Sequence, residues 1–191
     1  MFRWLALVFC LHALGACVGD PVLSDRPEPI GEFALGYSVV VAPHPVAAPL
    51  SRTATDVEWI VAVKAAVDRR FARYEGGSLY HIAVRVDGYM LAQPGIPVLL
   101  SPKSALIMNV TIWDDAAGKK LNPTPYQILV VESVNAKTLI GSGLTMTRQA
   151  QLENLANNAA LSIEGWLRNR QIERGWFDRP GSPPLLRDPA F

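Results

Sequence analysis

YHIAVRVD (residues 80–87) and ALIMNVTIW (residues 105–113) are the two stretches that decide the fold. In both, every second residue is apolar, and the residues between them are more mixed. The regularly spaced apolar residues are Tyr80, Ile82, Val84, Val86, Leu106, Met108, Val110 and Ile112. Alternation of this kind predicts β-strands with one face on a hydrophobic core and the other face outside it.

Two amphipathic helices are predicted on either side of these strands. The first begins with Thr55-Asp56-Val57-Glu58, a capping box in which Thr55 is the N-cap and Glu58 closes the reciprocal hydrogen bond. It ends at Gly76-Gly77. The second runs from Arg148 to about Arg170, with Thr147 as its N-cap. The expected apolar stripes are Val57, Ile60, Val63, Val67, Phe71 and Tyr74 in the first helix, and Leu152, Leu155, Ala159, Ile163 and Trp166 in the second.

A further strand is expected at residues 37–41, and a turn-rich tip at 114–120. Residues 128–131 and 138–140 are expected to form either one bent strand or two separate strands. The resulting order is β-α-β-β-β-α. It predicts an α+β fold, a two-layer sandwich in which a mainly antiparallel sheet of four or five strands carries two helices on one face.

The composition fits one globular domain. Of 191 residues, 50% are hydrophobic and 18% are charged, and the formal net charge is +1. Such a small charge argues against nucleic-acid binding. We divide the chain into a signal peptide (1–16), a lipidated tether (17–33), a single α+β domain (34–176) and a proline-rich C-terminal tail (177–191).

The N-terminus has the pattern of a secretory signal peptide. Arg3 precedes an apolar run from Trp4 to Ala16, which is shorter than the roughly 20 residues that a membrane-spanning helix needs. Leu14-Gly15-Ala16-Cys17, at the end of this run, resembles the lipobox of bacterial lipoproteins. The resemblance implies attachment of diacylglycerol to Cys17, cleavage before it and acylation of the new amino group.

This resemblance also implies a place in the cell. Several acyl chains on Cys17 would hold the chain durably at a bilayer. In the enterobacterial sorting pattern an aspartate after the cysteine favours the inner membrane, whereas this chain has Val18. We therefore expect a lipid-anchored protein at the outer membrane, facing the periplasm. The order of elements in the body is similar to that of several small Gram-negative outer-membrane lipoproteins.

The mature chain would contain no cysteine pair, because Cys10 leaves with the leader and Cys17 carries lipid. Removal of the leader also takes away Arg3, which leaves 17 basic residues against 17 acidic ones. We therefore expect neither a disulfide nor a zinc site, and a body that is electrically balanced.

Candidate catalytic and metal-binding residues are few. Gly141-Ser142-Gly143 lacks the G-x-S-x-G pattern of a nucleophile elbow and is interpreted as a strand bulge. His44 and His81 have no histidine or cysteine at metal-ligand spacing, so we interpret them as surface or edge residues. The sequence predicts no catalytic residue, no metal site and no cofactor.

Charged and aromatic residues are assigned structural roles. Asp114 and Asp115 are expected at a solvated hairpin tip, and Arg69, Arg70 and Arg73 on a solvated helix face. Core packing is expected for the four tryptophans that follow the leader, which are Trp59, Trp113, Trp166 and Trp176.

The main functional hypothesis is a non-enzymatic envelope lipoprotein that acts as an accessory or assembly subunit and binds another envelope protein. One alternative is a lipid or small-ligand carrier in the periplasm. Another is a periplasmic hydrolase whose site is assembled only in the fold. A large exposed apolar patch would favour a protein partner, a closed cavity a ligand, and a polar cleft an enzyme.

Overall fold

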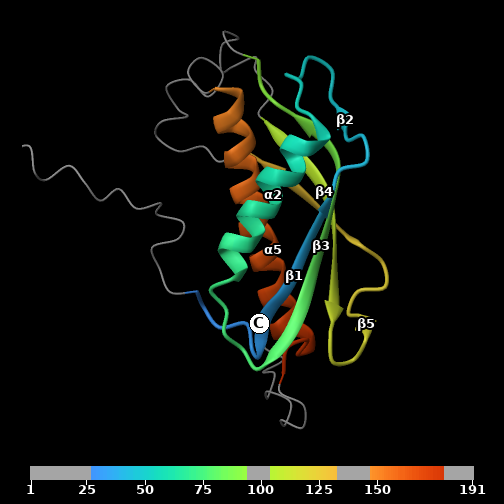
Figure 1. The fold of residues 1–191 in the computed structure, drawn as a ribbon, viewed down its shortest axis with the longest axis vertical. Helices are drawn as coiled ribbons and strands as arrows, with labels where there is room; N and C mark the ends of the chain where they lie inside the picture. Colours follow the sequence, from blue (N-terminus) through green and yellow to red (C-terminus); the bar gives the residue numbers. More distant parts are fainter. Residues whose placement is uncertain (1–26, 94–103, 133–146, 179–191) are drawn as a thin grey trace, which may run out of the picture.

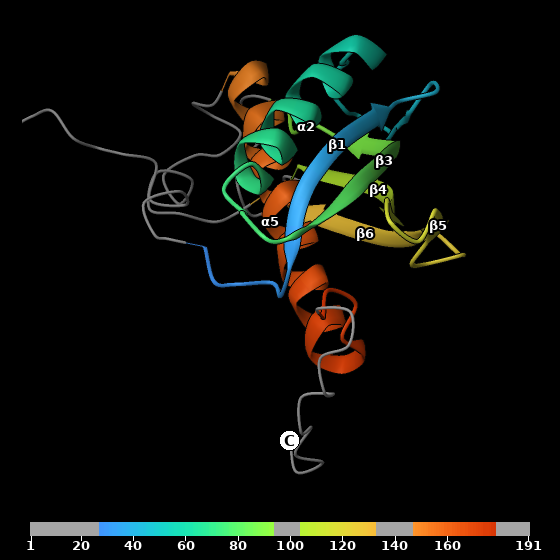
Figure 2. The same ribbon diagram turned by 60° about the horizontal axis from the view of Figure 1, so that its bottom comes forward.

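The structure is a computed structural model that describes residues 27–93, 104–132 and 147–178. Two helices lie side by side on one face of a six-stranded sheet (Figures 1 and 2). The elements are β1 (Phe33–Val41), β2 (Val46–Ala47), α2 (Asp56–Phe71), β3 (Ser78–Met90), β4 (Ala105–Asp114), β5 (Lys119–Lys120), β6 (Tyr126–Val131) and α5 (Arg148–Arg174). The predicted two-layer α+β sandwich is confirmed.

The sheet is only partly antiparallel. β1 and β2 both pair with β3 in parallel, whereas β4 runs antiparallel to β3, and β5 and β6 run antiparallel to β4. The parallel pair arises because α2 carries the chain back along the sheet between β1 and β3, so both strands start from the same end. Two of the six strands are only two residues long, which explains why the sequence predicted four or five.

The core lies between the sheet and the helices. All eight alternating residues that were predicted to face the core on β3 and β4 are buried. An aromatic cluster closes one end, where the Phe33 ring stacks 5.5 Å from Tyr80 and meets Phe177 edge-on at 5.2 Å. Because Ile30 and Phe177 are fully buried, packing extends beyond the 34–176 range expected for the domain.

The capping box at the start of α2 is confirmed. The hydroxyl of Thr55 accepts from the Glu58 amide at 3.2 Å, and the Glu58 carboxylate accepts from the Thr55 amide at 2.8 Å. The helix ends at Phe71, before Gly76-Gly77. Gly76 has a different role, because a Cβ there would lie 2.1 Å from the backbone carbon of Glu32.

The apolar stripe predicted for α2 is partly wrong. Val57 is 67% exposed, whereas Trp59 is fully buried. The buried face is therefore rotated at the start of the helix and includes Ala66 and Arg70 in addition to the predicted Val63, Val67 and Phe71.

α5 begins at the predicted N-cap, where the Thr147 hydroxyl accepts from the Ala150 amide at 3.1 Å. The helix continues through Gly165 to Arg174 and ends at Gly175, which adopts the left-handed conformation with φ 59°. It is therefore four residues longer than predicted. All residues of its predicted apolar stripe are buried.

Several predicted features lie outside the described residues. They are the leader with its lipobox, the strand at 138–140, the Gly141-Ser142-Gly143 segment and most of the C-terminal tail. In the parts of the chain that the structure describes, no helix combines the length and the apolar character needed to cross a membrane.

Candidate functional site

Within the described residues, no helix covers the face of the sheet that points away from α2 and α5 (Figure 2). This uncovered face is rich in exposed hydrophobic side chains. Tyr37 is 72% exposed and Leu129 63%. The large hydrophobic residues on this face are Tyr37, Val39, Val41, Leu79, Ile107, Trp113, Leu129 and Val131. Because successive side chains of a strand point to opposite faces, these residues project away from the core.

Strand register arranges six of these residues, together with Ala83, in two apolar strips. The first strip consists of Tyr37, Val39, Ala83 and Trp113. Val39 on β1 pairs with Ala83 on β3. The centre of the Tyr37 ring lies 5.0 Å from that of His81, and His81 pairs with Trp113 on β4. The second strip consists of Ile107, Leu129 and Val131, in which Ile107 pairs with Leu129. Neighbouring strands thus contribute to each strip, so each is a continuous surface.

A polar row formed by Arg85, Asn109 and Gln127 separates the two strips, because these residues are paired across β3, β4 and β6. The Nε atom of Arg85 lies 2.7 Å from the Asp87 carboxylate. The Asn109 amide also donates to the Asp87 carboxylate. The positive and negative charges in this row therefore balance each other within the chain, which lowers the cost of covering it.

A bulge in β1 fixes one corner of the first strip. The register shifts between Leu35 and Ser38, and the freed amide of Tyr37 donates to Nδ1 of His81 at 2.9 Å. Because Nδ1 accepts, Nε2 carries the proton and donates to Asp115 at 3.1 Å. His81, expected to be an ordinary edge residue, thus joins β1 to the hairpin tip.

Gly36 makes room for this arrangement. A Cβ at position 36 would lie 2.5 Å from Cε1 of the His81 ring, closer than carbon atoms can pack. The bulge and the histidine therefore depend on each other.

The open edge of β1 is protected along much of its length. Lys64 of α2 reaches over the edge, where Nζ donates to the Ser38 carbonyl at 3.2 Å and to its hydroxyl at 2.9 Å. Nearer the start of the strand, the Gly76 amide donates to the Phe33 carbonyl at 3.0 Å. A lysine and a bulge on an edge strand are features that discourage pairing with another strand. At β1, the face of the sheet and not its edge is therefore the open surface.

The Ser38, Lys64 and Asp68 cluster is the nearest approach to a catalytic arrangement in the described residues. Asp68 accepts from the Ser38 hydroxyl and lies 2.9 Å from Lys64 Nζ. A lysine that activates a serine must offer a lone pair, whereas Lys64 donates to three acceptors and so acts as an ammonium. The hydrogen bonds of the cluster therefore fit an edge clamp that ties α2 to β1.

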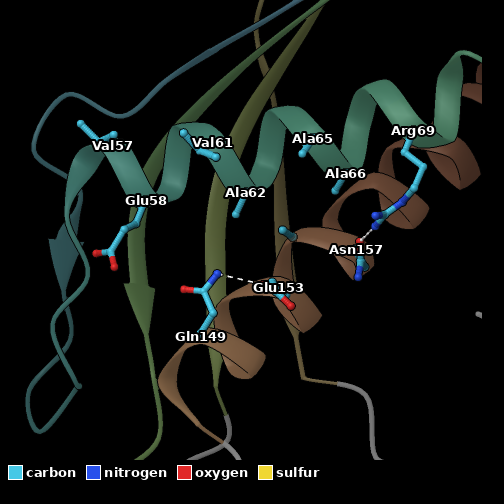
Figure 3. Close-up of a pocket in the computed structure, with 11 residues that line it drawn as sticks. Val57, Glu58, Val61, Ala62, Ala65, Ala66, Arg69, Gln149, Glu153 and Asn157 are labelled. Atoms are coloured by element: carbon cyan, nitrogen blue, oxygen red, sulfur yellow. Dashed lines mark hydrogen bonds between the residues drawn. The ribbon is translucent and has the colours of Figure 1, made fainter.

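A second surface feature is the groove between α2 and α5, with a volume of about 580 Å³ (Figure 3). Val57 and Val61 form an apolar wall, and the hydrogen bond between Arg69 and Asn157 lies at one end. The lining includes the small side chains of Ala62 and Ala66. It is open to the surface and is not the closed cavity that a carrier would need.

Arg70 corrects an expectation from the sequence. It was predicted on a solvated face but is only 4% exposed, and its Nη1 lies 2.7 Å from Oε2 of the equally buried Glu164. Tyr74 donates to the other Glu164 oxygen at 2.7 Å, and burial together with Glu164 raises the pKa of this phenol. Spacing could have revealed this position, because Arg70 lies three residues after Val67, on the buried stripe.

The other predicted residues divide between core and surface. Trp59 and Trp166 are buried as expected, but the prediction for Trp113 is wrong, because it is 39% exposed on the open face. His44 is exposed and lies 3.2 Å from Asp56. In residues 27–93, 104–132 and 147–178 no group of three histidine, cysteine or acidic side chains could hold a metal ion.

No protein-family model matches the sequence, and no curated protein matches it. Solved structures do match. One is a protein of Xanthomonas campestris assigned to the DUF330 family, with 12% identity and a TM-score of 0.44 over 76% of this chain and 92% of that one. Lipoproteins are among the others.

A candidate lipoprotein of Caulobacter crescentus is 16% identical, with a TM-score of 0.32 over 68% of this chain and 88% of its own. A minor lipoprotein of Acinetobacter baumannii is also 16% identical, with a TM-score of 0.31 over 72% of this chain and 95% of its own.

Proposed function

We propose that this protein is a non-enzymatic lipoprotein of a bacterial envelope that docks another protein through the uncovered face of its sheet. The lipobox at Leu14-Gly15-Ala16-Cys17 supports lipid anchoring, and Val18 supports a site at the outer membrane facing the periplasm. In this arrangement the anchor sets the location, and the folded domain acts as an accessory or assembly subunit.

The size of the apolar surface is the observation that carries this proposal. Its eight large hydrophobic residues are on average about half exposed. At about 175 Å² for a fully exposed large side chain, they offer roughly 700 Å² of apolar area over the two strips and their margins. The largest patch of an ordinary monomer is about 300–600 Å². A standard protein interface covers about 800 Å² on each partner, so this face is of the right size for one.

The alternatives receive less support from the geometry. The groove between α2 and α5 could in principle receive a lipid or small ligand, but it is open along the surface, whereas ligand sites enclose most of their ligand. Among the described residues the hydrolase hypothesis finds its nearest candidates in Ser38 and Lys64, whose hydrogen bonds are those of a strand clamp.

Affinity purification from detergent-solubilised envelopes tests this function. We expect the wild-type chain to retain a stoichiometric protein, and the double variant Val39→Lys/Leu129→Lys to lose it, since each lysine places an unpaired charge in one apolar strip. Val57→Lys is the matched control, because Val57 is equally exposed but lies on α2. Retention of the same protein by wild type and double variant alike would contradict the proposal.

A further inference from the structure

We propose that the protein docked on the uncovered sheet face is a second copy of this chain, so that two copies stack sheet to sheet. This rests on the proposed function, because it names the partner of the same face. Its first support is area. A face offering roughly 700 Å² of apolar surface approaches the 800 Å² per subunit that a standard interface buries.

The second support is charge. The chain from residue 17 onwards has 17 basic and 17 acidic residues, so two copies experience no net repulsion. On the face itself, the charge of Arg85 is paired with that of Asp87, and the Asp115 carboxylate accepts a hydrogen bond from His81. A partner of opposite charge would need a face with an excess of one sign, whereas this face is balanced and is compatible with itself.

The third support is the order of the strips. A face-to-face pair of identical sheets has a twofold axis that lies in the plane between them. If the axis runs along the strands between β3 and β4, the polar row covers the polar row, and the first strip covers its counterpart where it crosses β3 and β4. The second strip then covers β3 and β2 of the other copy, at the level of Gly88 and the exposed Val46. Arg85 then faces the partner subunit's Asn109, so that no like charges are opposed. Aligned stacking of two sheets about 10 Å apart is a common packing mode.

The protected edge of β1 disfavours strand addition at that side of the sheet. Lys64 caps the Ser38 carbonyl, and the bulge at residues 36–37 interrupts the regular edge. Two copies would therefore not extend each other's sheet through β1. A stacked pair leaves α2 and α5 on its two outer surfaces.

Sedimentation equilibrium of the full chain in density-matched detergent tests the inference. We expect wild type to sediment as a dimer, and the single variants Val39→Lys and Leu129→Lys each to weaken dimerisation at least tenfold. Both positions are more than half exposed, so the variants should fold, and thermal melting by circular dichroism checks this. Val57→Lys should dimerise like wild type. A monomeric wild type, or dimers that both face variants leave unchanged, would overturn the inference.

Co-expression of tagged and untagged copies separates this inference from the proposed function. If the tagged wild-type chain retains the untagged copy and the double variant Val39→Lys/Leu129→Lys does not, both the second copy and docking on this face are supported. If a different protein is retained and is lost in the double variant, the second copy is ruled out but docking on the face stands. If no protein depends on the face, both are wrong.

Discussion

Glu164→Gln is the substitution that most directly perturbs the contact between the two helices. Glu164 on α5 accepts from Arg70 and from Tyr74, both 2.7 Å away, and its side chain is 6% exposed. The amide keeps the shape of the carboxylate but removes its charge. Arg70, which cannot lose its proton, then loses the carboxylate charge that it contacts at 2.7 Å.

The expected cost follows from this burial. Removal of one partner of a buried ion pair destabilises a protein by about 3–5 kcal/mol, because the remaining charge stays desolvated. At about 2–4 °C for each kcal/mol in a domain of this size, the melting temperature should fall by roughly 6–20 °C. The double variant Arg70→Met/Glu164→Leu should recover part of the loss, since it leaves no buried charge.

Urea unfolding followed by circular dichroism measures these free energies. Glu173→Gln is the matched control. Glu173 also pairs with an arginine on α5, Arg170 at 2.7 Å, but its side chain is 53% exposed, so we expect a change within about 0.5 kcal/mol. If Glu164→Gln costs no more than this control, the buried pair does not hold the helices as the geometry implies.

Three further predictions test other parts of the molecule. Hydrogen bonds from Arg148 and from the Thr55 amide lower the pKa of Glu58 from 4.5 to about 2, so its stabilising effect is complete above pH 4.5 and is lost as the pH falls towards 2. The difference in unfolding free energy between wild type and Glu58→Gln should therefore shrink over this range, and a constant difference would argue against it. Gly36→Ala should cost about 1–3 kcal/mol, because the new Cβ displaces the His81 ring, and unchanged thermal melting would show that the bulge adjusts freely. Cys17→Ser should abolish incorporation of labelled palmitate, and undiminished labelling would refute the lipid anchor.

Local signals in the sequence predicted the secondary structure well. The alternation at 80–87 and 105–113 corresponds to the buried faces of β3 and β4, and the capping box at Thr55 starts α2. These features are readable because each depends on residues that are close together in the chain. The same reasoning failed for the direction of β1, because its pairing with β3 is set by packing across a helix and not by either strand.

The candidate site was much harder to predict. Ile107 and Trp113 are visible in the sequence as the second face of a strand, but the sequence does not show which strands lie beside it. The register that places Leu129 next to Ile107 appears only in the fold. Tyr37 joins the same surface through a bulge whose amide is satisfied by a histidine 44 residues away. Long-range pairing, and not composition, creates this face.

Arg70 is a charged residue whose burial the sequence analysis did not predict. A charged residue between two other arginines suggests a solvated face, yet its spacing from Val67 places it on the buried stripe. The deciding residue is Glu164, which lies 94 positions away and supplies the compensating charge. Sequence spacing could indicate that Arg70 is buried, but only the fold identifies its partner.

Photo-cross-linking in intact cells tests most directly that the uncovered sheet face docks a protein. A photoreactive amino acid replaces either Val39 on the face or Val57 on α2, two positions of similar exposure. The account predicts a discrete cross-linked protein band from position 39, at twice the monomer mass if the partner is a second copy, and no such band from position 57. Equal cross-linking from both positions, or none from position 39, would contradict it.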